Sequence, residues 1–347
     1  MAANQYVETY RQLSQAVHDA GLIRRCYGFY GAMIIGWLLA LAALLVAVVL
    51  LSDAWYQLII AALIGLVLTQ LAFLSHEAAH QQIFSSRGWN EWTARILSGL
   101  FVGVSYGWWM AKHNTHHAHP NQEGADPDVK STVLAFTPDA SDQRRGLRAK
   151  LAKHQGTYFV PLLLFEGLNL HYASVKMLFT EPHVAFRFTE IALIATRHTA
   201  FLTLLFSVLP AGLAFGFVGI QVSVFGFLLG GAFALNHIGM PTVPEGIRVD
   251  FLRRQVNMSR NIQNGPMVRL LMGGLQYQIE HHLFPVAPRP RLRTLRKFVR
   301  EHCSRHEIGY TERSMTEAFF TVVKYLNQVG MKNRDPYVCP LVQRYRG

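Results

Sequence analysis

Long apolar runs, interrupted by short turns, dominate two parts of the chain. No Lys or Arg occurs between Arg25 and Arg87, or between Arg197 and Arg248, so all 33 basic residues lie outside these two gaps. A helix that crosses a bilayer needs about 20 apolar residues, so each gap has room for two spans and a turn. Dividing the gaps at 52–54 and near 219–220 predicts spans near residues 31–51, 55–75, 199–217 and 221–238.

These runs lack the polar face that a helix of a soluble protein presents to water. The sequence therefore predicts an all-α integral membrane protein with four transmembrane helices in two hairpins. Both predicted turns lack Lys and Arg, whereas the flanking segments are rich in them. The positive-inside rule then places both termini and the middle segment in the cytosol, and the cell membrane is the expected location in a bacterium.

The segments outside the spans are polar and basic. Residues 1–25 carry apolar positions at helical spacing and predict an amphipathic N-terminal surface helix. We expect one membrane domain over residues 26–310, in which residues 160–178 lie in the membrane plane or are re-entrant and do not span. A C-terminal helix and tail over 311–347 would open at Ser314 and Glu317, which have capping-box spacing.

The formal charge of +12 suits binding to anionic lipids, a phosphate-bearing substrate or an acidic redox partner. Nucleic acid is a poor candidate partner for a protein with four membrane spans.

Seven of the 16 histidines fall in three short segments. His76-Glu77-Ala78-Ala79-His80 follows the second predicted span, His113-Asn114-Thr115-His116-His117 follows an aromatic segment, and Gln278-Ile279-Glu280-His281-His282 follows the last span. In each segment the chemistry-bearing side chains are three or four residues apart, which places them on one face of a helix. His237 stands alone at the cytosolic end of the last span.

Eight clustered imidazoles are more than one metal ion needs, and two metal ions account for them. Imidazole suits iron, zinc, copper and nickel, so the residue types alone do not choose the metal. Histidine ligands also need hydrogen-bond acceptors that fix their tautomers, and Glu77, Glu280, Asp126 and Asp128 are candidates. Lys112, Arg253, Arg254 and Arg260 are candidates to meet substrate phosphates or lipid head groups.

The three segments His-Glu-Ala-Ala-His, His-Asn-Thr-His-His and Gln-Ile-Glu-His-His, interleaved with two hydrophobic hairpins, resemble the histidine boxes of the membrane fatty acid desaturase superfamily. The resemblance covers roughly residues 55–310. The Gln that opens the third box resembles the front-end type, which desaturates between an existing double bond and the carboxyl end.

The resemblance implies a di-iron site in a helical cytosolic cap, with O2 as co-substrate. Carried over to this sequence, it implies that the catalytic metal ligands are His76, His80, His113, His116, His117, His237, His281 and His282. Gln278 departs from an all-histidine third box. An amide is a weak neutral ligand, so Gln278 would bind the metal through its oxygen, hold a water molecule or stay outside the ligand set. Some relatives place an asparagine one turn before the lone histidine, where this chain has Phe233, and neighbouring Asn236 receives no role.

The implied reaction inserts a cis double bond into a long acyl chain, carried as a lipid or a thioester. Removing hydrogens from adjacent methylenes is beyond ordinary acid and base side chains and calls for an oxidant made from O2 at redox-active iron. The electrons would come from a separate donor, such as a ferredoxin or a small haem protein with its reductase.

Two other enzyme classes fit parts of the sequence. His76, Glu77 and His80 match the H-E-x-x-H pattern of zinc proteases, in which the glutamate is the general base, but this reading leaves the other clustered residues idle. A di-iron alkyl or carotenoid hydroxylase or ketolase would use the same histidines and insert oxygen. A metal transporter or sensor would place its histidines along a path inside the membrane instead.

Overall fold

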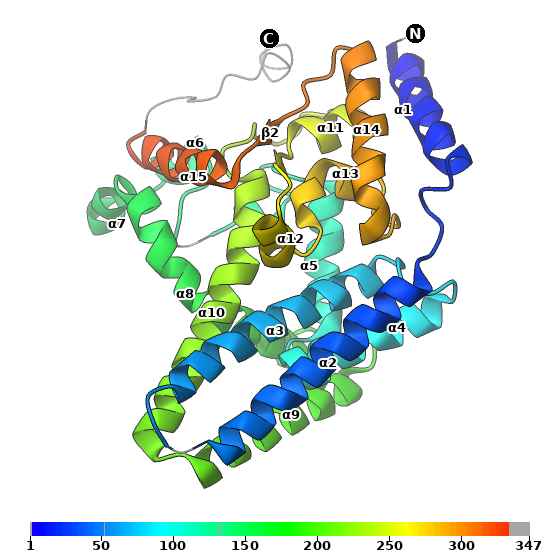
Figure 1. Cartoon of the computed structure of the whole chain (residues 1–347). Coiled ribbons are helices and arrows are strands. Elements are labelled where there is room, and N and C mark those ends of the chain that lie inside the picture. The colour runs from blue at the N-terminus through cyan, green and yellow to red at the C-terminus, as the bar shows by residue number, and fades with distance from the viewer. Residues whose placement is uncertain (1, 52, 132, 333–347) are drawn as a thin grey trace. The chain divides into compact units, whose positions relative to one another are not determined.

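The computed structural model describes residues 2–51, 53–131 and 133–332, with side chains from residue 7 onward (Figure 1). These residues are mostly helical, and their strands are two short segments of two residues each. The predicted all-α class is therefore confirmed. Contacts divide the chain into two compact units. Unit 1 takes the described residues of Met1–Arg24, Lys112–Pro161 and Ala232–Gly347, and unit 2 takes those of Arg25–Ala111 and Leu162–Gly231.

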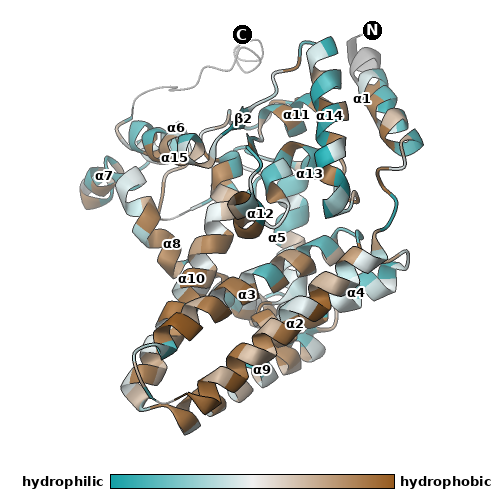
Figure 2. Cartoon of the chain, in the orientation of Figure 1, coloured by the Kyte–Doolittle hydropathy of each residue, from teal (hydrophilic) through white to brown (hydrophobic). Residues whose placement is uncertain are grey.

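Unit 2 contains the longest apolar helices. Among the described residues, four helices are long and apolar enough to cross a membrane: α2 (Tyr27–Leu50), α3 (Gln57–Ala79), α9 (Arg187–Val208) and α10 (Ala211–His237). Figure 2 shows hydrophobic residues along most of α2 and along long stretches of α3, α9 and α10. Many apolar side chains of α2, such as Leu39, Val46 and Leu50, are exposed, which suits contact with lipid rather than with water.

The first pair of predicted spans agrees with α2 and α3 to within a few residues, but the predicted break of the second pair is wrong. The prediction 199–217 crosses the observed turn, and the prediction 221–238 covers only the later part of α10. The chain turns at Leu209 and Pro210, and α10 runs through Gly219 without a break. Proline has no N–H for the helix and favours an extended residue before it, and Leu209 is extended. A glycine inside a helix costs only about 1 kcal/mol, so Gly219 does not interrupt α10.

The remaining elements of unit 2 pack against some of these helices. α4 (Arg87–Ile96) continues into the π-helical segment η1 (Leu97–Val102), and η1 packs against α3 and α9. The division between the units falls within α5 (Tyr106–Ala118), α8 (Gln155–Thr180) and α10. α8 contains the segment expected to lie in the membrane plane, and it is not one of the four candidate spans.

Unit 1 is built from shorter helices. Its elements besides parts of α5, α8 and α10 are α1 (Ala2–Asp19), η2 (Pro127–Val129), α6 (Pro138–Asp142), α7 (Gly146–Ala152), α11 (Phe251–Asn257), β1 (Asn261–Ile262), α12 (Pro266–Met272), η3 (Leu275–Tyr277), α13 (Gln278–Leu283), α14 (Arg289–Arg305), β2 (Glu312–Arg313) and α15 (Met315–Gly330). β1 and β2 pair in parallel, with Asn261 opposite Glu312. The predicted capping box is present, with Ser314 and Glu317 opening α15.

The N-terminal helix does not use its apolar face as predicted. Leu13 and Val17 of α1 are buried in a hydrophobic core that includes Leu295 and Val299 of α14. Tyr10 adds a hydrogen bond from its hydroxyl to the carbonyl of Leu283, 3.1 Å away. An amphipathic helix can bury its apolar stripe in lipid or in protein, and the sequence pattern is the same in both cases. Here protein covers Leu13 and Val17, so these side chains do not face a bilayer.

Candidate metal centre

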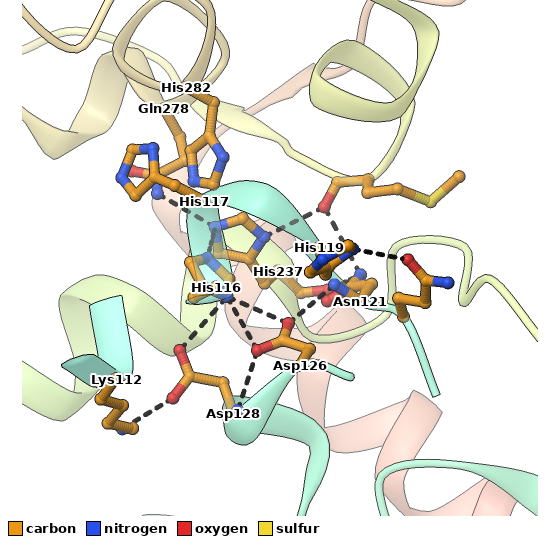
Figure 3. A network of polar contacts seen from close by, with 12 residues as sticks. Lys112, His116, His117, His119, Asn121, Asp126, Asp128, His237, Gln278 and His282 are labelled. Atoms are coloured by element: carbon orange, nitrogen blue, oxygen red, sulfur yellow. Dashed lines mark hydrogen bonds and ion pairs between the residues drawn. The ribbon is translucent and has the colours of Figure 1, made fainter. Parts of the chain in front are cut away.

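The second histidine segment lies on α5, and one of its imidazoles is held by carboxylates. His116 Nδ1 lies 3.0 Å from Asp126 Oδ2 and 3.4 Å from Asp128 Oδ2, and Lys112 Nζ lies 2.6 Å from Asp128 Oδ1 (Figure 3). Asp126 also accepts hydrogen bonds from the backbone N–H groups of Asn121 and Asp128. The turn that contains these residues and the His116 ring therefore share one carboxylate. Asp126 and Asp128, two of the candidate acceptors, therefore lie beside His116 Nδ1, and Asp126 also forms the turn that follows the histidines.

The electrostatics around His116 favour a positive charge on or near its ring. Burial lowers the pKa of His116, but the hydrogen bond with Asp126 and the charges of Asp128 and Asp126 outweigh it, and the net pKa is raised. A carboxylate that pulls on Nδ1–H also increases the electron density at Nε2. His116 Nε2 is therefore a stronger donor toward a cation than an isolated imidazole would be.

Two further imidazoles use Nδ1 in the same way. His237 Nδ1 donates to the carbonyl of Met258 at 3.0 Å, and His282 Nδ1 donates to Gln255 Oε1 at 2.9 Å. Gln255 is itself oriented, because its amide nitrogen donates to the carbonyl of His117 at 2.9 Å. Each acceptor assigns the proton to Nδ1 and leaves the lone pair on Nε2.

These three Nε2 lone pairs converge on one point. The candidate ligand atoms of His116, His237 and His282 lie within 4.8 Å of one another, and all three residues are buried. His116 Nε2 and His237 Nε2 are 3.3 Å apart, and His282 Nε2 has no hydrogen-bond partner in the part of the chain that the structure describes. Facing lone pairs in a buried site are unfavourable unless a cation lies among them. The residues therefore fit a metal ion bound by imidazole nitrogen.

A second group of imidazoles adjoins the first in unit 1. The candidate ligand atoms of His113, His117 and His281 also lie within 4.8 Å of one another. His117 Nε2 and His281 Nε2 are 3.1 Å apart. The rings of His117 and His282 stack with their centroids 4.2 Å apart, so the two groups are neighbours. Six of the eight predicted histidine ligands thus come together within unit 1.

The first histidine segment lies in unit 2, at the end of α3. His76 and His80 are buried, and their ring centroids are 4.7 Å apart. They face the same side of the helix end, as their spacing predicts. Glu77, which lies between these two histidines in the sequence, is also buried.

Gln278 presents its amide nitrogen to the histidines. Gln278 Nε2 lies 3.0 Å from His237 Nε2, while Gln278 Oε1 accepts from Asn236 Nδ2 at 3.0 Å. Asn236 Nδ2 also donates to the carbonyl of Leu275 at 2.9 Å, which fixes which way its own amide points. In this arrangement the oxygen of Gln278 is turned away from the centre. Sequence reasoning assigned no role to Asn236, because its partner lies 42 residues away.

Some other sequence candidates have different partners. Glu280 accepts from Asn261 Nδ2 at 2.7 Å and from the hydroxyl of Tyr310 at 2.9 Å, and burial raises its pKa to about 7. These two side chains, and not a histidine, are its hydrogen-bond partners among the described contacts.

Arg260 is buried and donates to the carbonyls of Leu235 and Ile238 at the end of α10. Its charge therefore stabilises a helix end and is not presented to a phosphate.

Comparisons with known proteins give the family. The fatty acid desaturase family model matches residues 53–314. The chain is 31% identical to Delta(6)-fatty-acid desaturase fat-3 of Caenorhabditis elegans, over 88% of this chain and 71% of that protein. It is 30% identical to Delta(8)-fatty-acid desaturase 2 of Arabidopsis thaliana, over 85% of this chain and 68% of that protein. It is also 29% identical to fatty acid desaturase 3 of Bos taurus, over 94% of this chain and 74% of that protein.

These relatives are named as desaturases, which does not favour the protease and hydroxylase alternatives. The matched region contains all three histidine segments and His237. The chain belongs to the fatty acid desaturase family and is a membrane oxidoreductase that acts on fatty acids.

Proposed function

We propose that this enzyme inserts a cis double bond into a long acyl chain at two iron ions, with O2 as co-substrate. The observation that carries the proposal is the convergence of the His116, His237 and His282 Nε2 atoms, whose Nδ1 atoms are all engaged by the protein. Iron bound there would supply the oxidising power that abstracts hydrogen from unactivated methylenes.

Eight histidines form the proposed ligand set. His116, His237 and His282 hold one side of the centre, and His113, His117 and His281 hold the other. We assign His76 and His80 to the same centre because the family resemblance counts all three histidine boxes. Neutral imidazoles leave the metal pair cationic, unlike carboxylate-rich centres in soluble helix bundles. The buried carboxylate of Asp126 offsets part of that charge through His116.

The surrounding residues hold the imidazoles in one tautomer and one orientation. Asp126, the Met258 carbonyl and Gln255 each keep a proton on Nδ1, so no ring has to rotate before its Nε2 binds metal. We propose that Gln278 lies outside the ligand set. With iron on His237 Nε2, the Gln278 amide nitrogen that lies 3.0 Å from this atom would hold a water molecule near the centre, and Asn236 keeps the Gln278 oxygen turned away.

The proposed regiochemistry is of the front-end type. The third box opens with Gln278 instead of histidine, which is the front-end pattern in sequence. Relatives named Delta(6)- and Delta(8)-fatty-acid desaturases and acyl-lipid (9-3)-desaturase support an acyl-lipid substrate, and we propose that the double bond is introduced toward its carboxyl end.

We further propose that the four spans form two hairpins and that both termini and the histidines face the cytosol. The absence of Lys and Arg from residues 26–86 and 198–247 of the sequence supports this topology. Electrons would then arrive from a cytosolic ferredoxin or small haem protein, which the basic cytosolic segments attract.

Metal analysis of the purified protein tests the proposed centre. We expect about two irons per chain, by mass spectrometry of the metal content, and loss of most of this iron in a His116→Ala, His237→Ala double variant. A single zinc per chain, retained in the double variant, would contradict the di-iron proposal and favour the H-E-x-x-H interpretation.

A further inference from the structure

Unit 1 contains a pocket that the histidine centre does not use. Its volume is about 660 Å³, which is in the range of small-molecule sites. It lies where α14, η3, β1 and β2 meet, and these elements contact one another in the fold. The residues that line it are Gln263, Asn264, Tyr277, Arg293, Arg296, Arg300, Ser304, Ile308, Tyr310 and Glu312.

Three arginines of α14 give the pocket a positive charge. Arg293, Arg296 and Arg300 are three and four residues apart and therefore line one face of the helix. Arg296 Nε lies 3.0 Å from Glu312 Oε2, so this pair is neutral overall. Arg293 and Arg300 are exposed, and within residues 7–332 as described neither has a carboxylate at ion-pair distance. The pocket thus has two cations in excess.

Hydroxyl and amide groups complete the polar lining. The hydroxyl of Tyr310 is held between Glu280 at 2.9 Å and Asn261 at 2.6 Å, which fixes its ring as one wall. Tyr277 is mostly buried beside the arginines, and burial raises its pKa, so it remains a neutral hydroxyl donor. The side chains of Gln263, Asn264 and Ser304 add donors that a ligand oxygen can use.

We propose that this pocket binds the phosphate group of a small molecule. Guanidinium groups offer paired N–H donors that match phosphate oxygens, and the two unpaired arginines can both reach one group on the same helix face. The aromatic walls leave room for an apolar or planar part beside the phosphate. A recessed pocket suits a small ligand better than a protein partner, which would need a broad surface. The phosphate can come from a soluble nucleotide, such as coenzyme A, or from a lipid head group.

The binding test does not depend on iron or on desaturation, so its failure and that of the proposed function are distinguishable. The purified full-length protein, in nanodiscs of phosphatidylcholine, is titrated with inorganic pyrophosphate and with coenzyme A by isothermal calorimetry. A parallel measurement uses binding of fluorescent phosphatidic acid to the protein in detergent. The soluble probes and the lipid probe distinguish the two sources of phosphate.

The decisive comparison is between two charge-matched variants of α14. Arg293→Gln with Arg300→Gln removes the pocket cations, whereas Arg291→Gln with Lys297→Gln removes two exposed cations of α14 that do not line the pocket. Because all four side chains are exposed and glutamine is a good helix former, both variants should fold. We expect the first variant to weaken binding of at least one phosphate probe by about tenfold or more, and the second by less than about threefold.

Two results would overturn the proposal. One is the lack of saturable binding of any of the three probes to the wild-type protein at millimolar concentrations. The other is an equal loss of binding in both variants, because this would mean that α14 attracts anions through diffuse charge, as a docking surface for an acidic protein would.

Discussion

At the scale of single residues, the centre depends on which nitrogen of each imidazole is free. His116, His237 and His282 all donate from Nδ1 to fixed acceptors and direct Nε2 inward. These acceptors are a carboxylate, a backbone carbonyl and a side-chain amide, so they differ in how strongly they polarise the ring. The carboxylate of Asp126 is fully buried and makes His116 the most strongly polarised of the three.

Replacing Asp126 with Asn tests this polarisation. The amide oxygen can still accept from His116, but the charge is lost, and we expect iron affinity to fall by roughly 10- to 100-fold. The measurement is iron content against chelator concentration. Asp128→Asn is the matched control, because Asp128 is partly exposed and its oxygen is 3.4 Å from His116, so its effect should be smaller. Equal losses in both variants would contradict a special role for Asp126.

Replacing Gln278 with Ala tests whether it is a metal ligand. Its oxygen is turned to Asn236, so we expect the Gln278→Ala protein to retain the wild-type iron content, whereas His237→Ala should lose iron. Asn236→Ala should also retain iron but destabilise the fold by about 1–3 kcal/mol, because it leaves the buried Gln278 oxygen without its donor. Iron loss in Gln278→Ala as large as in His237→Ala would show that Gln278 binds the metal.

At the scale of elements, close helix packing in unit 2 depends on glycine. A Cβ on Gly226 of α10 would overlap the backbone nitrogen of Gly167 of α8, and a Cβ on Gly167 would overlap the carbonyl oxygen of Val222. The two helices therefore approach so closely that backbone meets backbone. Small residues at such crossings allow the van der Waals contact that holds helices together in a membrane.

Replacing Gly226 with Leu should separate these helices and destabilise the protein by at least about 1–3 kcal/mol. Thermal unfolding in detergent, followed by circular dichroism, measures the change. Gly219→Leu is the matched control on the same helix, since a Cβ there has nothing within 4 Å. If the Gly219 variant lost as much stability as the Gly226 variant, the tight crossing of α8 and α10 would be wrong.

At the scale of the whole molecule, local patterns were predictable from the sequence and distant partners were not. The histidine spacing predicted three one-sided groups, and the apolar runs predicted α2 and α3 closely. The predicted turn near residues 219–220 differs from the turn at Leu209 and Pro210, because Pro210 lies inside an apolar run that reads as one continuous span. The burial of Leu13 and Val17, and the link between Asn236 and Gln278, depend on residues far away in sequence.

The most direct test of the central claim is the fatty-acid profile of a host that expresses the protein, measured by gas chromatography and mass spectrometry. The account predicts new acyl chains that are two hydrogens lighter than their precursors, with the added double bond between an existing one and the carboxyl end. The products should be missing from a host that expresses the His116→Ala, His237→Ala protein. Products that gain one oxygen, or a new double bond on the methyl side only, would contradict front-end desaturation.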